Sequence, residues 1–233
     1  MDVTRGLQAV FFDMDGLLVD SERLWLDVEH EVMAWLGVGW GSQHQEALVG
    51  GSLERTVAYM LALSGPVASS EEVGRRLLDG MGERLSAHVP LMPGAKELLA
   101  QVQDAGLPAA LVTSSHRRLL EHALDGIGRE FFTVTVAGDE VANTKPAPDP
   151  YLTAARLLNV TPGRCVALED SLTGIAAAEA AGCVTVAVPS VAAIPPAPGR
   201  TVVTSLTEVD LPRLRGLVSI RPAQPGSAAA HAV

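Results

Sequence analysis

Residues 8–16 read QAVFFDMDG, and this stretch decides the fold that the sequence predicts. Its apolar residues follow one another without alternation, which indicates a strand buried on both faces, as in a parallel sheet. The strand should stop at Gly16, so Asp13 and Asp15 are expected at its carboxyl end, where open α/β sheets bind ligands. Two acids without a base beside them need a cation, although an ordinary Asp-Gly turn would also explain the segment.

The composition limits the kinds of partner that the chain can have. Its 233 residues suffice for a large core that needs no disulfide or metal to fold. The 17 basic and 27 acidic side chains give a net charge of −10, and no basic stretch is interleaved with aromatic residues. Nucleic acid is therefore not an expected partner. A phosphorylated ligand would need a divalent cation and a few lysines or backbone amides to overcome this charge locally.

The apolar run that ends at Asp13 is too short and too interrupted for a signal peptide or a membrane span. A cytoplasmic protein without membrane contact is expected. Cys165 and Cys183 fall in apolar, strand-like runs without metal-type spacing. This predicts buried reduced thiols rather than a disulfide or a zinc site.

Helical patterns without a convincing strand fill residues 20–89. Ser21 is a plausible N-cap for the first helix, and Ser70 with Glu72 could open the last. The apolar residues recur at helical spacing over 21–36, 53–63 and 70–88. An all-helical unit is therefore expected directly after the first strand.

Strands and helices alternate regularly after residue 94, which predicts βαβ units and a parallel sheet. The expected strands cover 108–112, 132–137, 164–168 and 183–188, and the expected helices cover 95–105, 149–158, 172–181 and a segment from about 116. The predicted fold is a Rossmann-like α/β core (1–16 and 93–220) with an inserted helical cap (17–92) and a disordered tail (221–233). Linkers near 16–20 and 89–92 suit a hinge, so that the cap could close and exclude water.

Two polar clusters after predicted strands suit an anion. Thr113-Ser114-Ser115 precedes a helix, so the Thr113 hydroxyl and the Ser114 amide could hold a phosphate or could only cap that helix. Lys145 lies on a stiff, proline-rich loop, which suits an anion as well as an ordinary surface turn.

A third cluster, Glu169-Asp170, suits a metal. Two adjacent acids at the end of a buried strand are costly unless they meet a cation such as Mg²⁺, or they only favour the positive end of the next helix. Asp13 and Asp170 are natural partners for that ion. Together, the four clusters at successive strand ends form one site with the parts that phosphoryl transfer requires.

Four motifs in this order resemble those of the haloacid dehalogenase superfamily of phosphohydrolases, in the branch whose helical cap is inserted after the first strand. They read DMDG at 13–16, VTSS at 112–115, KPAPDP at 145–150 and LEDS at 168–171. The match extends to about residue 205. Each motif alone is weak, whereas the set of four is specific.

The resemblance implies a role for each motif residue. Asp13 is the nucleophile that becomes an aspartyl phosphate, and Asp15 protonates the leaving group and then activates water. Thr113 and Lys145 hold the phosphoryl oxygens. The implied Mg²⁺ ligands are Asp13, Asp170 and the main-chain carbonyl of Asp15, supported by Glu169.

Within this branch, the second aspartate favours phosphate chemistry over carbon–halogen cleavage. β-Phosphoglucomutases are similar over the core but carry a histidine and an arginine in the cap, where this chain aligns Trp25 and Leu53. Residues 20–25 and CVALEDS at 165–171 look more like bacterial phosphatases that act on hexose, deoxyhexose or hexitol phosphates. A small sugar phosphate is therefore the expected substrate.

The cap should set the specificity. The candidates for contact with the substrate are Glu22, Trp25, Trp40, His44, Arg55 and Tyr59, for which core packing or a solvated helix face is the alternative. The expected protein is a monomeric, Mg²⁺-dependent phosphomonoesterase acting on a small phosphorylated metabolite. The alternatives are a β-phosphoglucomutase-like sugar phosphomutase and a catalytically silent, phosphate-binding regulator.

Overall fold

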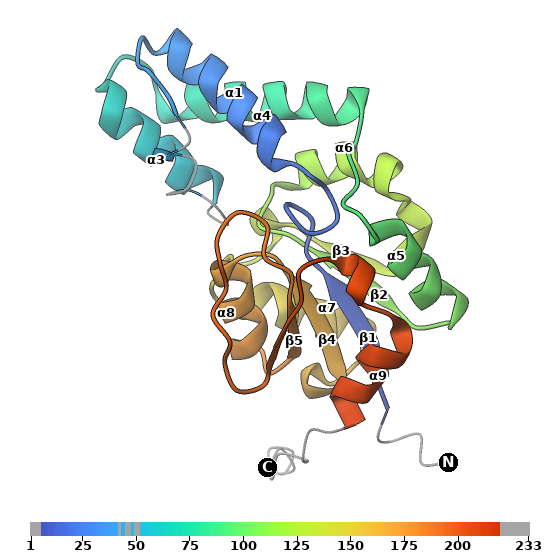
Figure 1. Ribbon diagram of the computed structural model, residues 1–233. Helices are drawn as coiled ribbons and strands as arrows, with labels where there is room; N and C mark the ends of the chain where they lie inside the picture. Colours follow the sequence, from blue (N-terminus) through green and yellow to red (C-terminus); the bar gives the residue numbers. More distant parts are fainter. Residues whose placement is uncertain (1–5, 42, 45–47, 49–51, 220–233) are drawn as a thin grey trace, which may run out of the picture.

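The computed structural model describes residues 6–41, 43–44, 48 and 52–219. Parallel strands form one sheet in the order β3-β2-β1-β4-β5-β6, with β1 and β4 at its centre (Figure 1). The strands are β1 (Ala9–Phe12), β2 (Ala109–Val112), β3 (Val134–Val136), β4 (Cys165–Glu169), β5 (Val184–Ala187) and β6 (Arg200–Val202). The predicted parallel α/β architecture is confirmed. The tail predicted over 221–233 lies outside the described residues.

Strand β1 is buried on both faces, which explains its unbroken apolar sequence. Val10 and Phe12 belong to the larger hydrophobic core, whereas Ala9 and Phe11 belong to a second core, because successive side chains of a strand point to opposite faces. Leucines from α5 (Ala95–Asp104), α6 (Arg117–Ile127) and α9 (Leu211–Ser219) fill the first core. The second core is covered by small residues of α7 (Asp149–Leu158) and α8 (Leu172–Ala180).

A helical layer apart from the sheet follows β1 in the chain, and we call it the cap (Figure 1). It consists of α1 (Glu22–Trp35), α3 (Leu53–Ser64) and α4 (Ser70–Ala87). Helix α4 lies against α6 of the core, where Arg118 Nη2 is 2.7 Å from Asp79 Oδ1 and Ser86 Oγ is 2.8 Å from His122 Nδ1. The cap is therefore docked on the core, and the prediction of an inserted helical cap is confirmed.

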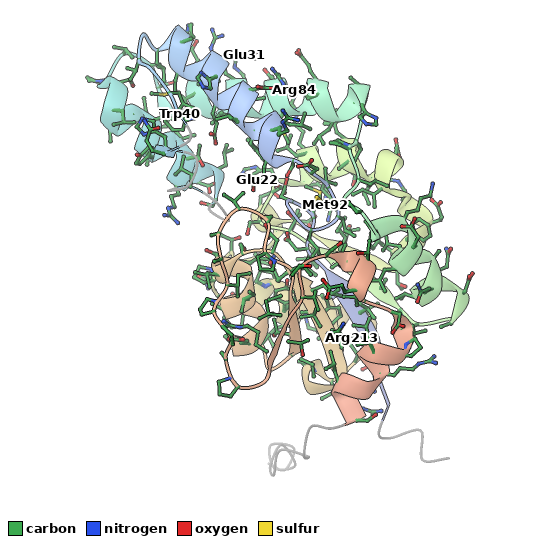
Figure 2. The ribbon with its side chains drawn as sticks, in the orientation of Figure 1. Glu22, Glu31, Trp40, Arg84, Met92 and Arg213 are labelled. Carbon is green, nitrogen blue, oxygen red and sulfur yellow. The ribbon has the colours of Figure 1, made fainter. Side chains whose placement is uncertain are left out.

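The chain enters and leaves the cap through one paired neck, formed by residues 18–20 and 90–92. Val19 and Leu91 form an antiparallel bridge, and backbone hydrogen bonds of 2.8 and 2.9 Å flank it. Figure 2 labels Met92 at this junction between the cap and the sheet. The neck coincides with the two linkers that the sequence predicts.

Some predicted element boundaries were wrong. Strand β1 ends at Phe12 rather than Gly16, so both aspartates stand in the loop beyond it. Strand β3 is shorter than the predicted 132–137, because the amide of Phe132 donates to the carbonyl of Arg129 at 3.2 Å and so belongs to the turn before the strand. The prediction also omitted β6 and α9. The remaining short elements are the 3-10 helices Arg129–Phe131, Gly138–Glu140, Pro162–Arg164 and Leu206–Glu208.

Two predicted helix caps also differ. Ser21 precedes α1 but makes no side-chain capping bond. Ser69 rather than Ser70 caps α4, since its hydroxyl accepts a hydrogen bond from the amide of Glu72 at 3.1 Å.

Cys165 and Cys183 are both buried, as predicted, and neither belongs to a disulfide. In the described part of the chain, every helix is too short or too polar to cross a membrane.

Candidate active site

Asp13 directly follows β1 and lies next to Glu169 of the neighbouring strand. Its amide donates to the carbonyl of Leu168 at 3.1 Å, which continues the pairing of β1 with β4. Lys145 Nζ lies 2.5 Å from Asp13 Oδ1 and 2.6 Å from Glu169 Oε1, and donates to the carbonyl of Val112 at 2.8 Å. Residues from all four predicted motifs thus meet at one buried point.

Burial controls the charge of this cluster. It raises the pKa of the Asp13 carboxyl well above its usual range, and the charge of Lys145 opposes that shift. Burial would lower the pKa of Lys145, but Asp13 and Glu169 together raise it, so the amine stays protonated. Burial and then the charge of Glu169 raise the pKa of Asp170 to about 8, against a 2.6 Å hydrogen bond from Ser190.

The acidic residues of this cluster fit a divalent metal ion. Asp13, Glu169 and Asp170 each offer a carboxylate oxygen within 4.8 Å of the others. Glu169 Oε2 is buried without a hydrogen-bond partner among the described residues, and the ammonium of Lys145 contacts only Asp13 and Glu169 of the three acids, so one cation would face three carboxylates once they ionise. Hard oxygen donors and uncompensated charge suit Mg²⁺. The Asp15 carboxylate is not part of this group in the described residues, and its main-chain carbonyl stays a predicted ligand.

Two glycines leave room for the acid pair. Gly16 has a φ of +78°, and a side chain on it would collide with Asp170 Oδ2. A side chain on Gly174, in the first turn of α8, would collide with both carboxylate oxygens of Glu169. The positions of these carboxylates therefore depend on the absence of a Cβ atom at residues 16 and 174.

Three donors hold the carboxyl group of Asp15. Ser115 Oγ and Thr113 Oγ1 donate to Oδ2 at 2.7 and 3.3 Å, and Trp25 Nε1 donates to Oδ1 at 3.3 Å. The first two donors come from the core and the third from cap helix α1. The orientation of Asp15 thus depends on both parts of the chain.

The cluster lies beside a cavity of about 100 Å³ between the strand ends and the cap. The predicted core residues that line it are Asp13, Asp15, Thr113, Ser114, Lys145 and Asp170. Of the predicted cap residues, Glu22 and Trp25 line the cavity, whereas Arg55 is exposed and does not.

The other aromatic candidates of the cap contact one another instead of the cavity. Trp40 stacks on His44 with ring centroids 4.7 Å apart, and the edge of Tyr59 meets Trp40 at 5.9 Å. His44 Nδ1 lies 3.0 Å from the Tyr59 hydroxyl. These three side chains therefore pack against one another, and of them Trp40 is buried in the core, as the alternative expects.

Glu29 is a cavity-lining residue that the sequence prediction missed. It lies in α1, is 4% exposed, and accepts a hydrogen bond from Trp40 Nε1 at 3.0 Å. Burial raises the pKa of Glu29 to about 7, against the hydrogen bond from Trp40. The spacing of Glu22, Trp25 and Glu29 by three and four residues places all three on one helix face. From this spacing, Glu29 could have been predicted to line the cavity together with Glu22 and Trp25.

Ser115, Tyr151 and Ser190 were also missed. The hydroxyl of Tyr151 in α7 donates to Glu169 Oε1, and Ser115 and Ser190 donate to Asp15 and Asp170. Ser115 could have been recognised as part of the predicted hydroxyl cluster, but the other two contacts arise only from the tertiary fold.

A central parallel sheet, an inserted helical cap and an Asp-Lys-Glu-Asp cluster at the strand ends together define a class of hydrolases. The chain belongs to the haloacid dehalogenase-like hydrolases, whose family model matches residues 10–188. The predicted resemblance is confirmed.

Individual relatives are similar over most of the chain. Hexitol phosphatase B of Escherichia coli K12 is 35% identical over 195 residues, which cover 82% of this chain and 87% of the relative. The crystal structure of a CbbY variant from Rhodobacter sphaeroides in complex with xylulose-(1,5)bisphosphate superposes with a TM-score of 0.80 at 30% identity, covering 89% and 99% of the two chains. β-Phosphoglucomutase of Clostridium difficile shares the fold, with a TM-score of 0.79 at 20% identity over 91% and 97% of the chains.

Proposed function

We propose that this chain is a Mg²⁺-dependent phosphatase that hydrolyses monophosphate esters of small sugars or sugar alcohols. The observation that carries the proposal is the meeting of Asp13, Lys145, Glu169 and Asp170 beside one cavity, with Asp15 next to them. Hexitol phosphatase B is named for a phosphorylated sugar alcohol, and the CbbY variant was solved with a phosphorylated ketose. Both relatives support a phosphorylated carbohydrate as the substrate class.

In the first step, an oxygen of Asp13 attacks the phosphorus atom, and the ester P–O bond on the opposite side breaks. Asp15 gives its proton to the departing sugar oxygen, so the sugar leaves as an alcohol. Lys145 lies against Asp13 and reduces the repulsion between the anionic nucleophile and the anionic phosphate. Thr113 and Ser114 line the same cavity, and in this proposal the Thr113 hydroxyl and the Ser114 amide bind phosphoryl oxygens.

In the second step, water attacks the phosphorus atom of the aspartyl phosphate. Asp15 accepts a proton from that water, and the bond between Asp13 and phosphorus breaks. Inorganic phosphate leaves, and both aspartates return to their starting forms. Mg²⁺ held by Asp13, Glu169 and Asp170 supplies further charge neutralisation at the phosphate when it is bound.

Phosphate release from a panel of hexose, deoxyhexose and hexitol phosphates tests this function, with Asp13→Asn beside the wild type. The variant should lower kcat by at least about 10³-fold, because it removes the nucleophile. Asp104→Asn, at an exposed aspartate near the end of α5, is the matched control and should leave kcat unchanged. Full activity of Asp13→Asn would refute the assignment of the nucleophile.

The same assay separates the alternatives. Isomerised sugar phosphate without release of phosphate would favour a phosphomutase. Binding of sugar phosphates by calorimetry without turnover of any of them would favour a regulatory protein. Release of phosphate that stops after chelation and returns with Mg²⁺ supports the proposal.

Binding of Mg²⁺ can be measured without turnover. Calorimetric titration of the chelator-treated protein should show a site that Asp170→Asn weakens, because that change removes a carboxylate ligand. Equal affinity of the variant and the wild type would refute the assigned metal site.

A further inference from the structure

Glu29 is a buried acid that faces the cavity but has no part in the chemistry proposed above. It lies two helical turns beyond Glu22 on the same face of α1, with Trp25 between them. Glu29 is 4% exposed, and a carboxyl group at such a site is costly unless it has a partner. Its position in the cap, away from the strand ends, places it where the organic part of a substrate would lie.

Trp40 holds the Glu29 carboxyl in place. The indole Nε1 donates to Glu29 Oε2 at 3.0 Å, and Trp40 is itself fixed by the ring of His44 at 4.7 Å and that of Tyr59 at 5.9 Å. A buried tryptophan side chain has only two rotatable χ angles, so Trp40 also restricts the position of the Glu29 oxygen that it binds. A carboxyl group accepts several hydrogen bonds, so the indole occupies only part of its capacity.

The cap side of the cavity is acidic. Among the described residues that line it, the cap contributes the carboxyl groups of Glu22 and Glu29 but no lysine or arginine. The sequence of the cap has arginines only at 23, 55, 75, 76 and 84, and the segment 41–52 contains no basic residue except His44. On the core side, Lys145 is already paired with Asp13 and Glu169. The His116 ring, which also lines the cavity, lies 3.3 Å from Glu54 and 3.6 Å from Asp139.

This charge distribution suits one kind of substrate. Hydroxyl groups of a polyol can donate to a fixed carboxylate, whereas a second phosphate or a carboxylate on the substrate would meet like charge at Glu22 and Glu29. Among the described lining residues, Lys145 and His116 are already paired with acids. We infer that Glu29 is a specificity-determining residue of the cap, which favours monophosphates whose organic part is an uncharged polyol and disfavours substrates with a second anionic group. This inference rests on the proposed phosphatase function.

A purely structural role is the competing explanation, in which Glu29 serves only as the acceptor for Trp40. Glu29→Gln separates the two roles, because the amide oxygen can still accept the indole hydrogen bond while the negative charge is lost. Glu31→Gln is the matched control, since Glu31 lies on the same helix, pairs with Arg84 at 2.7 Å and is 65% exposed (Figure 2). Thermal unfolding of both variants measures whether each is folded, and both should unfold cooperatively.

The experiment compares kcat and KM for a hexitol 6-phosphate, phosphoglycolate and a ketose 1,5-bisphosphate. Glu29→Gln should raise KM for the hexitol phosphate about 10-fold with little change in kcat, which is the loss expected for a hydrogen bond to a charged acceptor. The preference for the hexitol phosphate over the two competitors with a second anionic group, measured as a ratio of kcat/KM values, should fall by at least about 10-fold. Glu31→Gln should leave this ratio unchanged.

The outcomes distinguish this inference from the function on which it rests. Suppose that the wild type releases phosphate and that Glu29→Gln changes kcat/KM equally for all three substrates, or for none of them. This outcome refutes the role of Glu29 and leaves the phosphatase function intact. An effect of Glu31→Gln as large as that of Glu29→Gln also refutes it. A wild type that releases phosphate from no ester refutes the function itself.

Discussion

Trp25 Nε1 of the cap lies 3.3 Å from Asp15 Oδ1 of the core, so a cap helix donates a hydrogen bond to the proposed general acid. The other oxygen of Asp15 is bonded from the core side by Ser115 and Thr113. A carboxyl group held from two sides is fully oriented only when the cap is docked. The contact therefore links cap position to proton transfer.

Trp25→Phe tests this link. The variant keeps an aromatic ring in the cavity wall but removes the donor, so kcat should fall about 10-fold, as for the loss of one hydrogen bond to a charged group. Trp35→Phe is the control, since Trp35 ends the same helix and is 40% exposed. Steady-state kinetics that show the same kcat for both variants would contradict a role of Trp25 in orienting Asp15.

Lys145→Met should destabilise the fold as well as abolish turnover. Without the ammonium, Asp13 and Glu169 would remain as buried neighbouring acids, and breaking such a buried pair costs about 3–5 kcal/mol. Urea unfolding measures the loss. Lys96→Met, at an exposed position of α5, is the control and should change the free energy of unfolding little. Equal stability of both variants would mean that the acids are not held by Lys145.

Gly174→Ala should displace the Glu169 carboxylate, because the added Cβ atom meets its oxygens. Since Glu169 is one of the proposed metal-binding acids, the affinity for Mg²⁺ should fall at least about 10-fold in a calorimetric titration. The control is Gly216→Ala in α9, where a Cβ atom meets nothing within 4 Å. That substitution should leave Mg²⁺ binding unchanged and should not weaken the helix.

The buried acid Glu29 makes the stability of the fold depend on pH. Its pKa is about 7 in the folded chain, above the ordinary value of 4.5, so the folded state binds the proton more tightly than the unfolded state. The stabilisation from this proton is complete below pH 4.5 and is lost as the pH rises through 7. Its size is about 3 kcal/mol.

The Glu29→Gln variant has no titratable group at this position, so it lacks this dependence on pH. Relative to the wild type, its free energy of unfolding should therefore rise by up to about 3 kcal/mol between pH 4.5 and pH 8. Urea unfolding at both pH values measures the change. Glu31→Gln, at an exposed site of the same helix, should show no such trend, and a parallel pH profile of Glu29→Gln and wild type would contradict a raised pKa.

The sequence predicted those site residues that follow directly from the order of strands in a parallel sheet. An unbroken apolar strand has both faces covered, and parallel strands present their carboxyl ends at one edge. Asp13, Lys145 and Asp170 follow from this rule, because each comes soon after a strand and β1 lies between β2 and β4. The roles of these residues in catalysis remain predictions.

Residues whose environment depends on tertiary packing escaped the prediction. Glu29 occupies a helix that reads as amphipathic, and only the position of Trp40 shows that this acid is buried. Tyr151 reaches Glu169 from α7 across the second core, which no local pattern indicates. Strand β6 and helix α9 were missed because β6 has only three residues and α9 contains proline and glycine in a short run.

The neck at residues 18–20 and 90–92 has a consequence for how this chain can change. The segments that enter and leave the cap are hydrogen-bonded to each other, so the two ends of the insert are as close together as the ends of a tight turn. The length and fold of everything between them can therefore vary without altering the register of the strands that carry Asp13 and Lys145. A different insert could in this sense change the proposed substrate choice while the strand ends keep their places, provided that it kept the contacts of α4 with α6 and of Trp25 with Asp15.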